Sequence, residues 1–146
     1  MLDMNGLLPN LEILKDVQIL VVDHHRDSRD LDAYLLESYG ANVVTIGSIK
    51  GALDILDRLT PDILICEIAF PGERVNTLIE RVKHLALIAE RVIPILVTST
   101  CPATSFAQHL TAKVEAYLLK PIDLDDLVDQ VQNLLRLCCK KDAVLV

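Results

Sequence analysis

Short apolar runs alternate with longer amphipathic segments along most of the chain. Five runs rich in Val, Ile and Leu are predicted as strands, at residues 17–22, 42–46, 63–68, 93–98 and 116–119. Strands that are buried on both faces of a parallel sheet show such nearly continuous apolar runs. The pattern therefore favours a buried parallel sheet.

The segments between these runs carry apolar residues at the i, i+3, i+4, i+7 spacing of a helix. In chain order, this period covers residues 31–38, 49–59, 75–86, 103–111 and 124–135, and it is weakest in the fourth segment. On the first helix the apolar stripe is predicted from Leu31, Tyr34, Leu35 and Ser38.

Residues at the helix ends agree with these assignments. Gly40 fits a C-cap after the first helix, and Ser48 fits an N-cap before the second. Pro61 should close the second helix, and Asp123 can cap the last one. The element boundaries are therefore predicted by two independent signals.

Strict alternation of strand and helix predicts an α/β fold of the (βα)₅ type. It is a doubly wound, five-stranded parallel sheet with helices on both faces. The domain is expected over residues 17–138. Residues 1–16 form an N-terminal extension with its own apolar positions, either a short helix or an arm on the domain, and residues 139–146 form a C-terminal tail.

Composition excludes several classes of protein. Hydrophobic residues make up 51% of the 146 residues. No apolar run approaches the roughly 20 residues that a bilayer-spanning helix needs. There is also no basic start followed by an apolar stretch, so we expect no secretory signal, no membrane association and a cytoplasmic location. The net charge of −7 argues against nucleic acid as a partner, because phosphates need basic residues.

In open parallel sheets, ligands bind at the carboxyl ends of the strands. Asp23 follows the first run, with His24 and His25 behind it, and Glu67 ends the third run. The hydroxyl of Thr98 and the ammonium of Lys120 come at the ends of the fourth and fifth runs. Acids suit a cation, whereas hydroxyl and ammonium groups suit phosphate oxygens.

Four motifs in this order carry a resemblance to a known family. They read ILVVDHH, ICEIAFPG, ILVTST and AYLLKPID. Over residues 17–137 the chain resembles the receiver domains of two-component response regulators, which have a flavodoxin-like fold. The resemblance implies that Asp23 belongs to an acidic pair, that Thr98 and Tyr117 are switch residues, and that Lys120 contacts phosphate.

Two positions depart from the family pattern. The resemblance places the phosphoacceptor aspartate at Glu67, whose carboxylate reaches more than about 1 Å further. A misplacement on that scale can cost about a hundredfold in rate. His24 stands where the family has a second acid, which removes an oxygen ligand that Mg²⁺ prefers. Mg²⁺ binding is therefore doubtful, and no cofactor is expected.

The remaining pocket residues leave alternatives open. We expect Glu67 to pair with Lys120, and the pair could hold either an active-like or an inactive state. Asp23, His24 and Glu67, with His25, could hold a transition metal. Adjacent side chains at a strand end usually diverge, so we do not expect such a site.

Other candidate chemistry is weaker. The four cysteines lack zinc-site spacing, and Cys66 should be a core residue. Cys138 and Cys139 could form a redox switch beside two lysines, but packing of Cys138 on the apolar face is favoured. No Gly-x-Ser-x-Gly elbow or Gly-rich phosphate loop occurs, so we do not expect an enzyme.

These observations favour a pseudo-receiver that acts through phosphorylation-independent protein–protein contacts, without an output domain of its own. Its partner would be a kinase, a regulator or another receiver. The resemblance implies contact through the fourth helix, fifth strand and fifth helix, including Tyr117, and a homodimer through that face is plausible. One alternative is a receiver that still takes a phosphoryl group with Mg²⁺. Another is a flavin-binding protein, which the missing phosphate loop disfavours.

Overall fold

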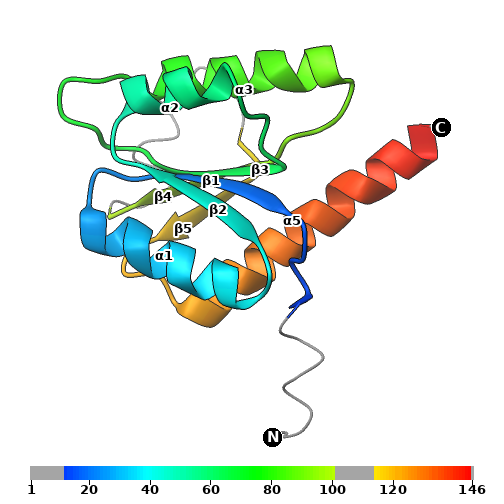
Figure 1. The fold of residues 1–146 in the computed structure, drawn as a ribbon, viewed down its shortest axis with the longest axis horizontal. Coiled ribbons are helices and arrows are strands. Elements are labelled where there is room, and N and C mark those ends of the chain that lie inside the picture. The colour runs from blue at the N-terminus through cyan, green and yellow to red at the C-terminus, as the bar shows by residue number, and fades with distance from the viewer. Residues whose placement is uncertain (1–11, 101–113, 146) are drawn as a thin grey trace, which may run out of the picture.

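The computed structural model describes residues 12–100 and 114–145, with side chains through residue 138. Within the described residues, the five strands and the helices between them follow the predicted order (Figure 1). In chain order they are β1 (Gln18–Val22), α1 (Arg26–Ser38), β2 (Asn42–Ile46), α2 (Ile49–Leu56), β3 (Ile63–Glu67), α3 (Val75–Ala89), β4 (Ile95–Ser99), β5 (Ala116–Leu119) and α5 (Leu124–Leu145). The fourth predicted helix, residues 103–111, lies outside the described residues.

The strands form one parallel sheet in the order β2-β1-β3-β4-β5, which confirms the predicted fold class. Strand order reverses between β1 and β3, which is the switch point where ligands bind in this topology. Asp23 directly follows β1, and Glu67 ends β3. The fold therefore brings the two carboxylates to the same crevice.

Helices cover both faces of the sheet, with α2 and α3 on one side and α1 and α5 on the other (Figure 1). Leu20 and Val22 of β1 point into the α2/α3 core, whereas Ile19 and Val21 point into the α1/α5 core. This period of two is that of a strand buried on both faces. Leu14 of the N-terminal extension is 1% exposed and joins the α1/α5 core.

Several element boundaries differ from the predicted ones, two of them for a clear local reason. β4 begins at Ile95 rather than at residue 93, because Pro94 has no N–H for the strand ladder. α2 ends at Leu56 rather than at residue 59, because its last turn tightens into i→i+3 bonds ahead of Pro61. α5 continues to Leu145, through most of the segment predicted as a tail.

The predicted apolar stripe of α1 is wrong in its rotation about the helix axis. Leu31 and Tyr34 are 49% and 76% exposed, and the buried side chains of the helix are Asp32 and Leu36. The true inner face thus lies one position later than the apolar pattern indicates. Hydrophobicity alone does not identify this face, because it contains the polar side chain of Asp32.

The predicted caps are present, and one further cap was not predicted. Oγ of Ser48 accepts a hydrogen bond from the N–H of Gly51, and Asp123 accepts bonds from the first turn of α5. Gly40 follows α1 with a φ of 97°, a conformation that glycine adopts readily. Glu73, in the β3–α3 loop, accepts bonds from the first two N–H groups of α2, at 3.0 Å each.

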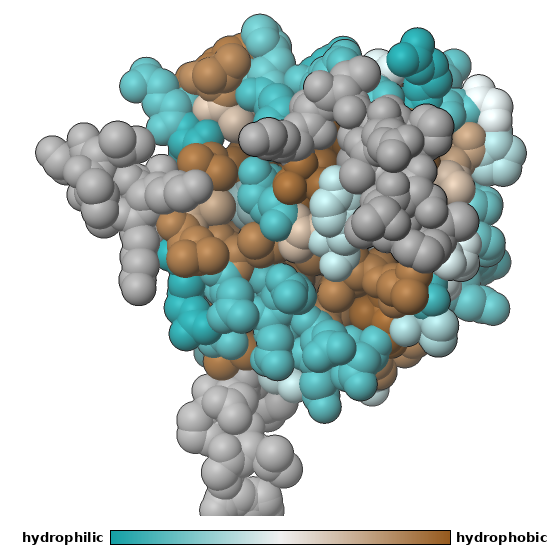
Figure 2. All heavy atoms as spheres, turned by 180° about the vertical axis from the view of Figure 1, so that it is seen from behind, coloured by the Kyte–Doolittle hydropathy of each residue, from teal (hydrophilic) through white to brown (hydrophobic). Residues whose placement is uncertain are grey.

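The described surface carries apolar side chains among polar ones (Figure 2). The large exposed ones are Leu31, Tyr34, Leu87, Ile88, Leu119 and Leu137. Among the described helices, none is long and apolar enough to cross a membrane.

Candidate functional site

A buried lysine joins two carboxylates at the carboxyl edge of the sheet. Nζ of Lys120, just after β5, donates to Oδ2 of Asp23 at 2.8 Å and to Oε1 of Glu67 at 2.9 Å. The side chains of Asp23 and Glu67 are 4% and 3% exposed, and that of Lys120 is 11% exposed. The expected Glu67–Lys120 pair is therefore present, and Asp23 shares the same ammonium.

The charges in this pocket stabilise each other against burial. Burial opposes ionisation of Asp23, but hydrogen bonds from Lys120 and from the backbone N–H of His25 outweigh it and lower its pKa. Burial likewise opposes the charge of Lys120, and its bonds to Asp23 and Glu67 outweigh burial and raise its pKa. Two carboxylates and one ammonium leave the cluster with a net charge of −1, counted with neutral imidazoles.

The two histidines converge on Glu67, so the expectation that adjacent side chains diverge is wrong here. Nδ1 of His24 lies 2.5 Å from Oε2 of Glu67, and Nδ1 of His25 lies 3.2 Å from Oε1. The two imidazole centroids are 3.9 Å apart, and the ring of His24 also packs near Phe70. The chain turns from β1 into α1 at His25, and this turn brings both rings to the same side.

Thr98 and Tyr117, which are the predicted switch positions, lie on the neighbouring strands β4 and β5. Thr98 pairs in register with Glu67 and is 2% exposed, and Tyr117 pairs with Val97. Tyr117 is half-buried against the α2/α3 core. At this edge, the backbone N–H of Lys120 donates a hydrogen bond to the carbonyl of Ser99 at 2.7 Å. Five of the six predicted site residues therefore lie at this edge of the sheet, whereas Tyr117 lies further back along β5, level with Val97.

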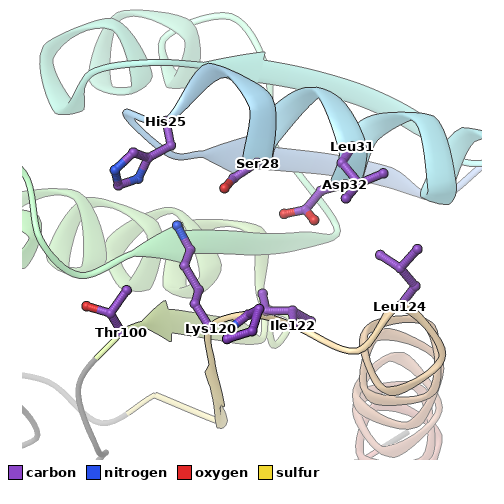
Figure 3. Close-up of a pocket in the computed structure, with 9 residues that line it drawn as sticks. His25, Ser28, Leu31, Asp32, Thr100, Lys120, Ile122 and Leu124 are labelled. Atoms are coloured by element: carbon purple, nitrogen blue, oxygen red, sulfur yellow. The ribbon is translucent and has the colours of Figure 1, made fainter.

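A groove of about 400 Å³ opens beside the pocket, between α1 and the loop that joins β5 to α5. Figure 3 shows His25, Ser28 and Asp32 facing the side chains of Lys120 and Ile122 across it. Burial, with a smaller contribution from the charge of Asp23, raises the pKa of Asp32 to about 6. The groove was not predicted from the sequence. Asp32, a carboxylate next to the predicted apolar stripe of α1, was the residue that could have indicated it.

The two described cysteine side chains are core residues. Cys66 and Cys138 are buried, and burial, with the charges of Asp23 and Glu67, raises the pKa of the Cys66 thiol. A thiol with a raised pKa is a poor nucleophile. The predicted core role of Cys66 is confirmed. The side chain of Cys139 lies outside the described residues.

The sequence profile of the response regulator receiver domain matches residues 19–132. The chain belongs to this family. Receiver domains are signalling domains that interact with kinases and other signalling proteins, and this chain has that general function.

Relatives and solved structures agree with the receiver assignment. An uncharacterised 14.6 kDa protein of Leptolyngbya boryana is 34% identical over 123 residues, which are 84% of this chain and 93% of that protein. The regulator of RpoS of Escherichia coli is 33% identical over 78% of this chain, but the chain spans 33% of that protein's length.

Two solved structures show the same fold. A CheY-like receiver domain protein of Methanospirillum hungatei superposes with a TM-score of 0.75 at 19% identity, over 87% of this chain and 99% of that one. A two-component response regulator of Clostridium difficile gives 0.73 at 21% identity, over 83% and 97%.

Proposed function

We propose that this receiver signals through protein–protein contacts without accepting a phosphoryl group. The observation that carries the proposal is the contact of Lys120 with Glu67 at 2.9 Å. In the family pattern this lysine contacts phosphate on an aspartate. Here the carboxylate of Glu67 accepts a hydrogen bond from the ammonium without any phosphate, and Asp23 accepts a second one.

The surroundings of Glu67 also disfavour transfer of a phosphoryl group. An attacking carboxylate needs a free oxygen aligned on phosphorus and a metal ion that neutralises the incoming charge. Oε1 of Glu67 already binds Lys120 and lies 3.2 Å from His25, and Oε2 faces His24. His24 supplies no hard oxygen for Mg²⁺. Both requirements are therefore weakened at the same residue.

A single carboxylate attracts a lysine ammonium less strongly than a phosphoryl group does. The phosphoryl group carries a charge of about −1.5 to −2 and three acceptor oxygens, whereas Glu67 carries one charge and two oxygens. The ion pair therefore holds Lys120 in one position, without the second state that phosphorylation would add. We infer a constant binding surface rather than a switch.

The partner that best fits this surface is another signalling protein, in the cytoplasm. Leu119 at the end of β5 and Leu137 on α5 are each 57% exposed, on two of the three elements of the predicted contact face. A net charge of −7 favours a protein partner over a nucleic acid. A homodimer through the same face is the simplest form of such a contact, and light scattering after size exclusion measures it directly.

The test is incubation of the full chain with Mg²⁺ and acetyl phosphate, followed by intact mass measurement. We expect no adduct, and no Mg²⁺-dependent NMR shift with beryllofluoride. The double variant Glu67→Asp, His24→Asp is the positive control, and it should gain both responses. A stoichiometric phosphoryl adduct on the unaltered chain would contradict the proposal and support a conventional response regulator.

A further inference from the structure

The carboxylates and imidazoles at the ends of β1 and β3 form a compact set of metal-ligating atoms. Asp23, His24, His25 and Glu67 each offer one such atom, and these atoms all lie within 4.8 Å of one another. Two nitrogen and two oxygen donors thus meet in a pocket whose acidic members are buried. The receiver pattern itself places oxygen ligands here, so the nitrogen donors depart from that pattern.

Lys120 binds only one oxygen of each carboxylate. It binds Oδ2 of Asp23 and Oε1 of Glu67, which leaves Oδ1 and Oε2 turned toward the histidines. Oδ1 accepts a hydrogen bond from the backbone N–H of His25 and retains lone pairs. Each carboxylate therefore has one oxygen that Lys120 does not bind, and Oε1 of Glu67 lies near both Lys120 and His25.

Two atoms beside the imidazoles have no hydrogen-bond partner among the described residues. They are Nδ1 of His24 and Oε2 of Glu67, and both are buried. They lie 2.5 Å apart but do not meet in hydrogen-bonding geometry. Leaving such a buried polar atom unpaired costs free energy, so a shared ligand for both atoms would be stabilising.

The charge of the pocket also favours a cation. The carboxylates of Asp23 and Glu67 outweigh the single ammonium of Lys120. The nearby guanidinium of Arg29 bonds to the backbone carbonyls of Asp23 and His24. The side-chain carboxylates therefore keep an excess charge of −1 with neutral imidazoles.

The donor set selects the class of ion. Mg²⁺ prefers six oxygen ligands in octahedral geometry, whereas imidazole nitrogens suit Zn²⁺, Ni²⁺ or Co²⁺. Bonds of about 2.0–2.2 Å to zinc place neighbouring ligand atoms of a tetrahedral site roughly 3.3–3.6 Å apart. Nδ1 of His25 lies 3.5 Å from Oδ1 of Asp23, which is within that spacing, and its 3.2 Å distance to Oε1 places it beside the carboxylate of Glu67.

One contact must open for an ion to enter. The 2.5 Å between His24 and Glu67 has to widen by about 1 Å to reach tetrahedral spacing. The side chain of His24 is 30% exposed, so its ring can move outward without disturbing the core. Lys120 and its two bonds need not change.

We propose that this pocket binds one divalent transition-metal ion of the zinc class, through Nδ1 of His24, Nδ1 of His25 and Oε2 of Glu67, with Oδ1 of Asp23 as the fourth ligand. The proposal concerns the same pocket as the proposed function but does not depend on it. Metal binding is measured without a phosphodonor, so either proposal can fail alone.

The experiment is calorimetric titration of the tag-free, chelator-treated full chain with Zn²⁺, and with Mg²⁺ in parallel. We expect saturation at one Zn²⁺ per chain and at least tenfold weaker binding for His24→Gln and for His25→Gln. The matched control is His84→Gln on α3, where the side chain is exposed and far along the chain from the pocket; its affinity should be unchanged. Circular dichroism verifies that each variant is folded.

Cobalt identifies the ligands independently. Co²⁺ in this site should give the intense visible bands of tetrahedral coordination without thiolate charge transfer, and alkylation of the accessible thiols should leave the affinity unchanged. The proposal is overturned by absence of saturable binding, by equal affinity of the two histidine variants and the unaltered chain, or by binding that disappears on alkylation.

Discussion

Replacing Lys120 with Met removes the ammonium that two buried carboxylates share, while it keeps most of the side-chain volume. Asp23 and Glu67 lose hydrogen bonds of 2.8 and 2.9 Å, and neither can turn to solvent because both are almost fully buried. Hydrogen bonds to charged groups contribute about 1.5–3 kcal/mol each. Removing one member of a buried ion pair typically costs about 3–5 kcal/mol, and we expect a loss in that range.

The assay is urea unfolding of the unaltered chain, Lys120→Met, Glu67→Met and the double variant. Because the free energy of unfolding of such a domain is about 5–15 kcal/mol, the single variant should remain folded but with a clearly lower midpoint. The double-mutant cycle isolates the Lys120–Glu67 term, which should exceed about 1 kcal/mol. A coupling energy below about 0.5 kcal/mol would refute the view that Glu67 holds the lysine.

The pH dependence of this loss has a defined sign. The lowered pKa of Asp23 means that its stabilisation is present above its ordinary pKa of 3.8 and disappears as the pH falls through the folded value. The raised pKa of Lys120 means that its stabilisation is present below 10.5 and disappears as the pH rises through the folded value. The difference between the unaltered chain and Lys120→Met should therefore be constant from about pH 5 to 9 and shrink outside that window.

Three further substitutions test other parts of the structure, each by urea unfolding. Asp32→Asn should raise the free energy of unfolding at pH 7 by about 1–2 kcal/mol, after discounting for partial solvation, because folding raises the pKa of Asp32 to about 6. It should also abolish the loss of stability as the pH rises from 4 to 6, and an unchanged slope would contradict the assignment. Ser48→Ala should cost about 1 kcal/mol through loss of the α2 cap, and no change would mean that Glu73 caps the helix alone. Leu96→Ala, in the α1/α5 core at 0% exposure, should cost about 2–5 kcal/mol, and a cost below 1 kcal/mol would show that this core is loosely packed.

The sheet could be predicted from the sequence because its central strands are buried on both faces. Residues 63–67 and 95–99 are buried throughout, so hydrophobicity alone marks them. The rotation of α1 could not be predicted in the same way, because its inner face carries Asp32 beside the pocket. The hydrophobic periodicity of a helix does not reveal which face is buried where that face lines a polar site.

The site could be predicted as far as it depends on strand ends. Asp23, Glu67 and Lys120 meet because parallel strands bring their carboxyl ends to one edge, and the strand order sets which ends are neighbours. The direction of His25 depends on how the chain turns into α1, and the cap from Glu73 depends on the path of a loop. Neither leaves a pattern in the residues themselves.

The two departures from the receiver pattern, His24 and Glu67, have complementary effects on the charges and contacts of the pocket. An acid in place of His24 would put a third carboxylate beside Glu67 with Lys120 as the neighbouring cation, an arrangement that needs a metal ion to be stable. A neutral imidazole at His24 removes that repulsion. The extra methylene of Glu67 lets one oxygen reach Lys120 while the other reaches the imidazole. The pair of changes therefore lowers the negative charge that a third carboxylate would bring to the pocket, and it leaves the nitrogen and oxygen donors that suit a different ion.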